Sequence, residues 1–314
     1  MKDSELKAQG PPLEVDNTIL SILTTCPRKT YWFLRGLDYK TTPRYFIVGR
    51  AFGAALNEWH TSEGTPIMER VGKMLNKAQE IWTAEAPEEP QEGGKKEIDS
   101  WETLKDTLLA YVDNYGEHEP WRMPYDKGEI GFKVPLPGTS VLYCGSIDAP
   151  IEWEPYGMLI REDKTTGAWI NQGYLDQWDF STQVTGYIMA AWILLGEPFG
   201  CYMNIAGKKP RKEPSDRFAR YLTKRSQWQI DEFVRDTRRL IESLQREWDT
   251  WTWPKLGQRN PMNCAGGMGR SRCLYQSLCL QEADPWQLEE GFQFIDEFTW
   301  RGKWAPWERD GSDD

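Results

Sequence analysis

Two neighbouring stretches decide the fold of this chain, residues 145–153 (GSIDAPIEW) and residues 159–167 (LIREDKTTG). Both are rich in β-branched and aromatic residues and are separated by Pro and Gly turn signals, which is typical of successive strands. Residues two apart share one face of a strand, so Glu162 and Lys164 project together while Asp163 points the other way. With Asp148 arriving from the preceding strand, the sequence predicts a compact acidic site that holds one cationic side chain.

These residue types suit phosphate chemistry. Asp148 and Glu162 could hold Mg²⁺ or Mn²⁺ and leave positions open for water. A metal ion in that position polarises a phosphate and lowers the pKa of a bound water. Lys164 could orient that water or stabilise the charge that develops on the phosphate oxygens. Without further residues, the same pattern also fits a solvated strand face.

The surrounding sequence predicts one α/β domain with a helical insertion. Helical spacing of apolar residues predicts helices over 17–37, where Pro27 is a potential break, and over 46–60, 66–84, 100–116, 175–196 and 227–250. Short strands are predicted around 128–137, 201–207 and 218–224. We therefore expect a flexible arm over 1–16, the domain over 17–285 with its insertion at 61–126, a cysteine-rich segment at 261–280, and an aromatic and acidic tail over 286–314.

The predicted helix after the second strand adds a further motif, because Gln183 and Tyr187 are four residues apart and share a helix face. The order G-x-x-D, E-x-K-T, Q-x-x-x-Y resembles the RecB-like branch of the PD-(D/E)XK nuclease superfamily. The matching residues are Gly145, Asp148, Glu162, Lys164, Thr165, Gln183 and Tyr187. The resemblance implies a restriction-endonuclease-like core, a mixed sheet flanked by helices. It also implies that Asp148 and Glu162 bind the metal, that Lys164 is catalytic, and that Gln183 and Tyr187 line the site and contact DNA.

The branch also has an upstream helix motif, a Gly followed four residues later by a metal-binding His. Here Gly53 is followed by Asn57, and His60 lies three residues further on the same helical side. An Asn carbonyl oxygen is a plausible hard ligand for Mg²⁺. The metal could therefore be served by Asn57 or by His60, and His60 could equally be an ordinary surface or core histidine.

Six cysteines occur in a chain whose N-terminus, MKDSELKAQG, has no apolar signal region, so a disulfide framework is not expected. Cys264, Cys273 and Cys279 follow the spacing C-x8-C-x5-C, without the C-x2-C knuckles of zinc ribbons. Together with Cys26 in its Thr-Cys-Pro-Arg-Lys run, they resemble the iron–sulfur nucleases of the same branch, the AddB and CRISPR-adaptation exonuclease type. The resemblance implies a [4Fe–4S] cluster that clasps the N- and C-terminal segments together. Cys144 and Cys201 fall in predicted strands and are expected to be buried.

The net charge of -10 excludes a protein that binds nucleic acid over its whole surface. Residues 207–225 nevertheless carry eight basic and two acidic side chains, a local charge of +6. The candidate phosphate-contacting residues are Lys208, Lys209, Arg211 and Lys212. The alternative is an ordinary solvated loop.

The sequence thus predicts a Mg²⁺- or Mn²⁺-dependent deoxyribonuclease. The resemblance implies an exonuclease acting on single-stranded or end-containing DNA in recombination or repair, with a helicase or recombination partner. The alternative is a weak or inactive scaffold subunit with the nuclease fold, which the change to Asn57 favours. No run approaches the ~18 apolar residues of a membrane helix, so we expect a cytoplasmic protein without membrane contact.

Overall fold

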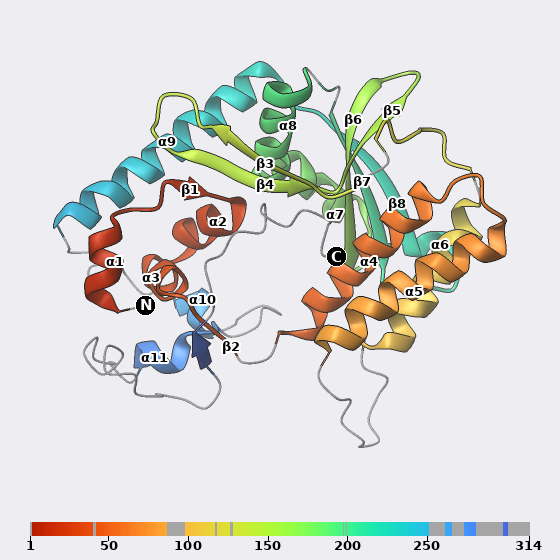
Figure 1. Cartoon of the computed structure of the whole chain (residues 1–314), viewed down its shortest axis with the longest axis horizontal. Helices are drawn as coiled ribbons and strands as arrows, with labels where there is room; N and C mark the ends of the chain where they lie inside the picture. The colour runs from red at the N-terminus through yellow and green to blue at the C-terminus, as the bar shows by residue number, and fades with distance from the viewer. Residues whose placement is uncertain are drawn as a thin grey trace. The chain divides into compact units, whose positions relative to one another are not determined.

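The computed structural model describes residues 2–39, 42–86, 98–116, 118–125, 128–196, 198, 200–250, 261–265, 273–280 and 298–300. These residues form a mixed α/β protein (Figure 1). The chain divides into two compact units. Unit 1 comprises residues 1–41, 133–145 and 231–308, and unit 2 comprises residues 42–132, 146–230 and 309–314.

A four-stranded mixed sheet of order β5-β6-β7-β8 organises unit 2. β5 (Ala149–Trp153) and β6 (Gly157–Thr166) form an antiparallel hairpin that turns at Gly157, whose φ of 71° suits glycine. β6 runs parallel to β7 (Gly200–Gly207), and β8 (Phe218–Thr223) is antiparallel to β7. Parallel neighbours need a crossover connection. Here it consists of α7 (Gln172–Asp176), a 3₁₀ turn (Gln177–Phe180) and α8 (Thr182–Leu195).

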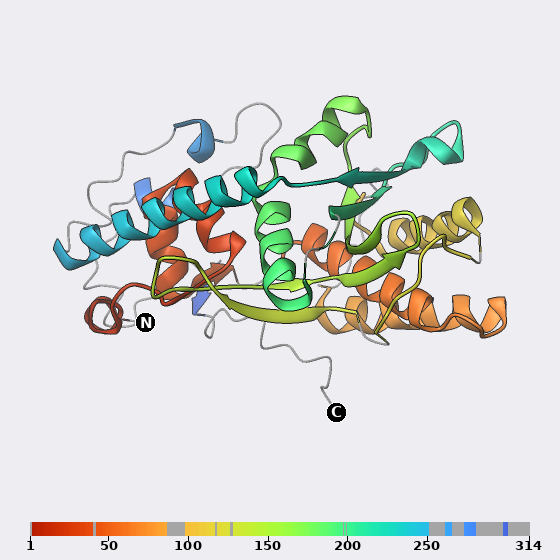
Figure 2. The same ribbon diagram turned by 90° about the horizontal axis from the view of Figure 1, so that it is seen from above.

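Helices cover both faces of this sheet (Figure 2). α4 (Arg44–Thr61) packs on one face of β6 and α8 on the other. The sequence of α4 repeats apolar residues every three to four positions, which gives it one continuous apolar stripe. That stripe packs against α5 (Ile67–Glu85) and α6 (Trp101–Tyr115) around the fully buried Leu56, Met74 and Leu108. α5 and α6 lie within the range expected for the helical insertion.

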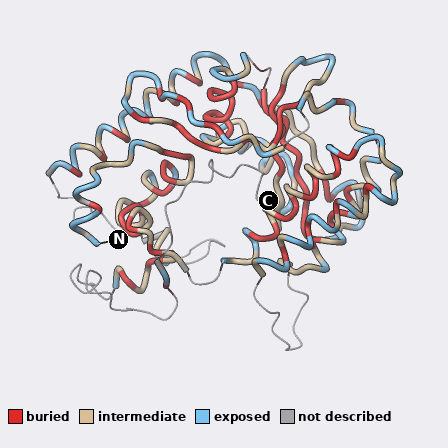
Figure 3. Tube along the Cα trace, in the orientation of Figure 1, coloured by how far each residue is buried: buried red, intermediate tan, exposed pale blue. Residues whose placement is uncertain are grey.

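The central strand β7 is buried along its whole length, as the red trace of Figure 3 shows. A strand covered on both faces reads as a continuous apolar run, and CYMNIAG over 201–207 fits that pattern. Cys201 in β7 and Cys144 in β4 (Leu142–Ile147) are both completely buried, which confirms the prediction made for them.

Unit 1 contains α2 (Asn17–Thr25), α3 (Pro27–Arg35), β2 (Leu37–Tyr39), β9 (Phe298–Trp300), α10 (Pro261–Ala265), α11 (Gln276–Leu280) and most of α9 (Gln227–Thr250). The single helix expected over 17–37 is two helices. Pro27 occupies the first turn of α3, where its missing N–H costs nothing, and Gly36 ends α3 in the left-handed conformation at φ 85°.

The first sixteen residues are not the flexible arm that the sequence suggested. They contain α1 (Asp3–Gln9) and β1 (Glu14–Val15), and Leu6 is buried in a core with Trp32, Leu244 and Tyr275. β1 pairs in parallel with β4, and the three-stranded sheet has the order β1-β4-β3, where β3 spans Ile130–Pro135. The polar composition of this stretch concealed the few apolar residues that anchor it.

Of the expected tail, only residues 298–300 are described, as strand β9 paired with β2. The acidic end of the chain lies outside the described residues, as do residues 87–97 within the expected helical insertion. Across the described ranges, none of the helices is both long enough and apolar enough for a bilayer crossing.

Candidate active site

The two faces of β6 carry different chemistry, as the alternation of the strand predicts. On one face the ammonium group of Lys164 donates to Oε1 of Glu162 and forms an ion pair with it. The Glu162 side chain is only 3% exposed, whereas that of Lys164 is 27% exposed. The pair therefore has a buried acidic end and a cationic end that solvent reaches.

The start of α8 supplies the next side chains on this face. Ser181 caps the helix by accepting a hydrogen bond from the Val184 amide, which places Gln183 in the first turn. The Gln183 amide donates to Oε1 of Glu162 at 3.1 Å and to the Tyr187 hydroxyl at 3.1 Å. The structure therefore brings Glu162, Lys164, Gln183 and Tyr187 together, from a strand and a helix that are separate in sequence.

Asp148 joins this group from the bend between β4 and β5. Its Oδ2 atom accepts a hydrogen bond of 2.7 Å from the backbone N–H of Asp163. That amide belongs to the residue between Glu162 and Lys164, so the same strand segment orients both carboxylates. Three of the four hydrogen bonds described for this group involve a residue of β6.

The electrostatics of the group show how strongly these charges interact. Burial raises the pKa of Asp148 well above its usual range, and the neighbouring Glu162 carboxylate raises it further. Burial also raises the pKa of Glu162, although Lys164 opposes that rise. For Lys164, burial by itself lowers the pKa, but the two carboxylates outweigh it and leave the pKa above its usual value. One lysine thus offsets only part of the cost of placing two carboxylates side by side.

One polar atom in the group has no partner. The Oε2 atom of Glu162 is buried and accepts no hydrogen bond from any described residue. A buried carboxylate oxygen without a partner costs free energy, on the order of 1–3 kcal/mol. A hard divalent cation next to Asp148 would satisfy this oxygen and lower the repulsion between the two carboxylates. The donor set therefore fits Mg²⁺ or Mn²⁺, with two protein carboxylates and the remaining positions left to water.

The opposite face of β6 holds a polar network that the sequence analysis did not identify. Arg161 donates to Oδ2 of Asp163 at 3.0 and 3.1 Å, and both side chains are almost fully buried. The Asn204 amide donates to Oδ1 of Asp163 at 2.7 Å and to the Tyr111 hydroxyl at 3.1 Å. The alternation that pairs Glu162 with Lys164 also pairs Arg161 with Asp163, so the signal for this network was present in the sequence.

Asn57 lies on this second face, which corrects the expectation that it binds the metal with Glu162. Its carboxamide oxygen accepts a hydrogen bond from the Arg161 guanidinium, and its side chain packs against Gly128. The motif placed Asn57 on the inward side of α4, but that side of α4 covers the Arg161 face of β6. A buried guanidinium needs acceptors, and Asn57 provides one.

His60 also lies on the Arg161 side, buried against Trp121 with ring centroids 4.6 Å apart. Neither ring nitrogen has a hydrogen-bond partner among the described residues. Burial lowers the pKa of His60 well below its usual value, and Arg161, Arg70 and Arg220 lower it further. His60 is therefore a neutral core histidine in this structure, one of the alternatives that the sequence left open.

The basic segment 207–225 divides into structural and exposed cations. Lys208 is buried and paired with Asp99, so the expectation that it contacts DNA is wrong. Arg217 is paired with Asp106, and Arg220 with Glu119. Lys209 and Lys212 are exposed, and Arg211 is half-buried. About half of the local positive charge therefore stabilises unit 2 and is not available to a ligand.

The cysteines expected to hold an iron–sulfur cluster all belong to unit 1. The Cys273 amide donates to the Cys264 carbonyl at 3.2 Å, and Cys273 and Cys279 pack on the core that contains Tyr31 and Trp32 of α3. Burial raises the pKa of the Cys273 thiol, and the Cys264 and Cys279 thiols contribute to that rise. The three late cysteines are thus neighbours, and α3, which Cys26 precedes, belongs to the same core. Over the described ranges, no three His, Cys, Asp or Glu side chains are arranged closely enough to hold a metal ion.

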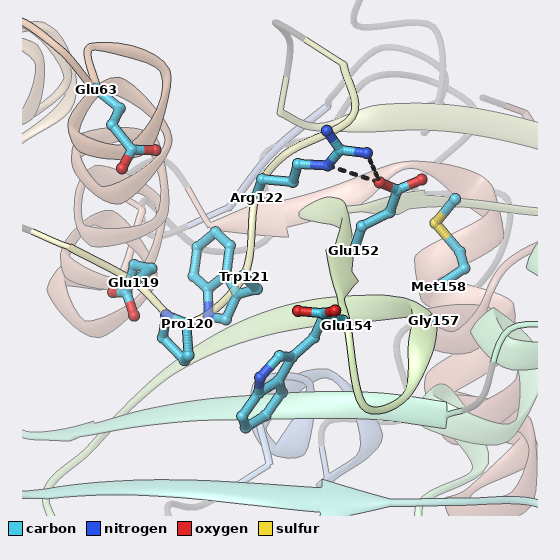
Figure 4. Close-up of a pocket in the computed structure, with 10 residues that line it drawn as sticks. Glu63, Glu119, Pro120, Trp121, Arg122, Glu152, Glu154, Gly157 and Met158 are labelled. Atoms are coloured by element: carbon cyan, nitrogen blue, oxygen red, sulfur yellow. Dashed lines mark hydrogen bonds and ion pairs between the residues drawn. The ribbon is translucent and has the colours of Figure 1, made fainter.

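A cavity of about 610 Å³ opens on the Arg161 side of the sheet (Figure 4). Figure 4 shows Arg122 paired with Glu152 at its rim. Its lining residues are Glu63, Glu119, Pro120, Trp121, Arg122, Glu152, Trp153, Glu154, Gly157 and Met158. The cavity is lined by four carboxylates and one guanidinium, so it would repel the phosphate backbone of a nucleic acid. The cavity and the acidic group at Asp148 and Glu162 are therefore separate features.

No family model matches the chain, and no curated protein matches it. Among solved structures, the chain is similar to the crystal structure of a candidate exonuclease from Eubacterium rectale, with a TM-score of 0.49 and 11% sequence identity. The alignment covers 90% of this chain and 98% of the other.

Proposed function

We propose that this chain is a metal-dependent nuclease that hydrolyses phosphodiester bonds in DNA at the group formed by Asp148, Glu162 and Lys164. The observation that carries the proposal is the buried Oε2 atom of Glu162, which has no partner among the described residues and lies next to a second carboxylate and a lysine. Two crowded carboxylates with a free oxygen are arranged for a divalent cation, and the exposed end of Lys164 suits an anionic substrate.

Asp148 and Glu162 are the residues that would hold Mg²⁺ or Mn²⁺. When bound there, the metal supplies a polarised phosphate and a water of lowered pKa. Lys164 places a positive charge where the scissile phosphate becomes more negative. Gln183 holds Oε1 of Glu162, and the Asp163 amide holds Oδ2 of Asp148, so each carboxylate has one fixed oxygen and presents the other. Orientation by neighbouring hydrogen bonds of this kind is a common requirement of metal ligands.

A second candidate function is a nuclease-fold subunit that binds DNA with little or no cleavage. The position of Asn57 favours it, because Asn57 is engaged by Arg161 and leaves two carboxylates as the protein ligands. Fewer protein ligands make metal binding depend more on water and on the substrate phosphate, which is the feature expected of a weakly active site.

A cleavage assay separates the two functions. It uses one labelled single-stranded oligonucleotide and one labelled duplex. Mg²⁺, Mn²⁺ and EDTA are compared, with Glu162→Gln as the matched inactive control. Cleavage that requires metal and is lost in E162Q supports the nuclease. DNA binding without cleavage by the wild type supports the scaffold subunit, and absence of both overturns the two candidates together.

We further propose that Cys26, Cys264, Cys273 and Cys279 hold a [4Fe–4S] cluster, with a structural role in unit 1. The four thiols are free of disulfides, and Cys273 and Cys279 pack on the same core as α3. Protein purified without oxygen should be brown and contain iron. Cys26→Ala should lose the colour and Cys201→Ala should keep it, whereas zinc without iron would overturn the cluster.

A further inference from the structure

The segment between β6 and α8 carries two exposed aromatic rings. Trp169 is 64% exposed and Phe180 is 84% exposed, and both lie in the crossover that follows Lys164. Tyr174 and Trp178 lie between them on α7 and the 3₁₀ turn, with ring centroids 6.1 Å apart. Core packing does not explain large exposed aromatic side chains in the segment that directly follows the strand of Glu162 and Lys164.

Trp169 is held in place by the basic segment. The guanidinium of Arg211 stacks over the Trp169 ring at 3.7 Å and donates to the Ala168 carbonyl at 3.1 Å. A cation stacked on one face of the indole fixes the ring and leaves it largely open to solvent. Lys209 and Lys212, which lie close to Arg211 in sequence, are exposed, so the segment that supplies Arg211 also offers two further cations to solvent.

The same segment is tied to the acidic group of β6. Burial raises the pKa of the Tyr174 hydroxyl, whereas Thr166, the last residue of β6, and Lys164 oppose that rise, so Tyr174 lies near both residues. α7 is fixed at its start by Asn171, whose side chain accepts a hydrogen bond of 2.9 Å from the Tyr174 amide. Trp169 is therefore joined on one side to the basic segment and on the other to the strand of Glu162 and Lys164.

We propose that Trp169, with Arg211 stacked beneath it, is a stacking platform for an unpaired base of a nucleic-acid strand that enters the active site. This inference rests on the proposed nuclease function and names the part of the substrate that the chain reads. An exposed ring stacked on a guanidinium, whose segment also carries two exposed lysines, suits a base and its flanking phosphates in shape and in charge. A base in a duplex has both faces stacked already, so the platform selects single-stranded nucleic acid.

The test is binding of labelled oligonucleotides in EDTA, measured by fluorescence anisotropy for wild type, Trp169→Ala, Trp169→Phe and Trp228→Ala. Trp228 is the matched control, because it is also 64% exposed but lies on α9. Three probes are compared: oligo(dT), an abasic strand of the same length, and a blunt hairpin duplex. The abasic strand keeps the phosphates and removes the base that would stack.

W169A should weaken binding of oligo(dT) by about 5- to 100-fold, the range expected for one lost stacking contact. It should leave binding of the abasic strand and of the duplex within about twofold of wild type. W169F should recover most of the affinity for oligo(dT), and W228A should behave as wild type. Circular dichroism and thermal unfolding confirm that each variant is folded.

Two results would overturn the platform while leaving the proposed nuclease in place. One is a W169A variant that binds oligo(dT) as well as W228A does. The other is an equal loss on oligo(dT) and on the abasic strand, which would mean that Trp169 positions Arg211 for phosphate contact only. A wild-type protein that binds none of the probes and cleaves no DNA would instead overturn the proposed function itself.

Discussion

The two faces of β6 differ in whether their buried carboxylate oxygens have hydrogen-bond partners. On the Arg161 face, both oxygens of Asp163 are hydrogen-bonded, by Arg161 and by Asn204. On the Glu162 face, one carboxylate oxygen has no partner among the described residues, and two carboxylates share a single lysine. Strand alternation distributes these four charged residues of one strand, 161 to 164, to the two faces.

Buried charge therefore stabilises the fold on the Arg161 face, whereas on the Glu162 face it favours the binding of a ligand. On the Arg161 face, the hydrogen bonds that link Asp163, Arg161, Asn204, Asn57 and Tyr111 fix one arrangement of α4, α6, β6 and β7. A crowded group with an unmet oxygen stays costly until a ligand arrives, which is the condition expected of a binding site. Substitutions on the Glu162 face should therefore change activity, and substitutions on the Arg161 face should change stability.

The largest effect is expected from Glu162→Gln. We expect the rate of DNA cleavage to fall on the order of 10⁴-fold, to the EDTA background, because the metal loses a charged ligand. The free energy of unfolding should stay the same or rise slightly, since the substitution removes a buried carboxylate whose pKa burial has raised. Single-turnover cleavage and urea unfolding measure the two quantities.

The control for this variant is Glu154→Gln, which changes an exposed glutamate in the β5–β6 turn. It should leave both quantities unchanged. A pure, folded E162Q variant that cleaves within threefold of wild type would show that the Glu162 face is not the active site.

The next effect is expected on the other face, from Asp163→Ala. This change leaves the fully buried Arg161 guanidinium without its carboxylate, so the free energy of unfolding should fall by about 3–5 kcal/mol. The double variant Arg161→Met, Asp163→Leu should recover most of the loss, because it removes both charges together. Urea unfolding of the three proteins gives the answer, and a loss below about 1 kcal/mol in D163A would mean that the network is not structural.

A smaller effect is expected from Asn57→His, which tests the sequence resemblance against the structure. The resemblance predicts that the variant binds Mn²⁺ more tightly, since imidazole suits transition metals. From the position of Asn57 we expect no gain in Mn²⁺ affinity and a loss of about 1–2 kcal/mol of stability, because Arg161 loses an acceptor and the contact with Gly128 leaves little room for the larger ring.

Calorimetric titration with Mn²⁺ and urea unfolding measure both effects, with the exposed Asn76→His on α5 as the control. A tenfold gain in affinity specific to N57H would place Asn57 at the metal after all.

Local patterns were enough to predict much of this molecule. Two-residue alternation predicted that Glu162 and Lys164 share a face, and helical spacing predicted that Gln183 and Tyr187 do. Periodicity also predicted the buried side of α4. It does not predict which face of the sheet that side covers, and for this reason the prediction for Asn57 was wrong. Lys208 reads as one more cation in a basic run, and only its distant partner Asp99 shows that it is structural. Local sequence patterns do not show which residues that are far apart in sequence will be in contact, so these contacts were not predicted.

The smallest effect concerns the acid sensitivity of the Arg161 face. Burial and the guanidiniums of Arg161, Arg70 and Arg220 hold the pKa of His60 well below its usual value, so the neutral form of His60 is favoured in the folded state. Unfolded His60 accepts one as the pH falls through about 6.5, so stability present at neutral pH is lost towards acid pH. His60→Leu removes this contribution, and between pH 7 and pH 5.5 the unfolding free energy of the variant should fall by about 1 kcal/mol less than that of the wild type.

His118 is the matched control, because the chain has 2 histidines and the His118 side chain is 85% exposed. Urea unfolding at the two pH values should show the wild-type decline for His118→Leu and a shallower one for H60L. Equal declines in all three proteins would mean that His60 can take up a proton in the folded state, and that the Arg161 face is less closed than its hydrogen bonds indicate.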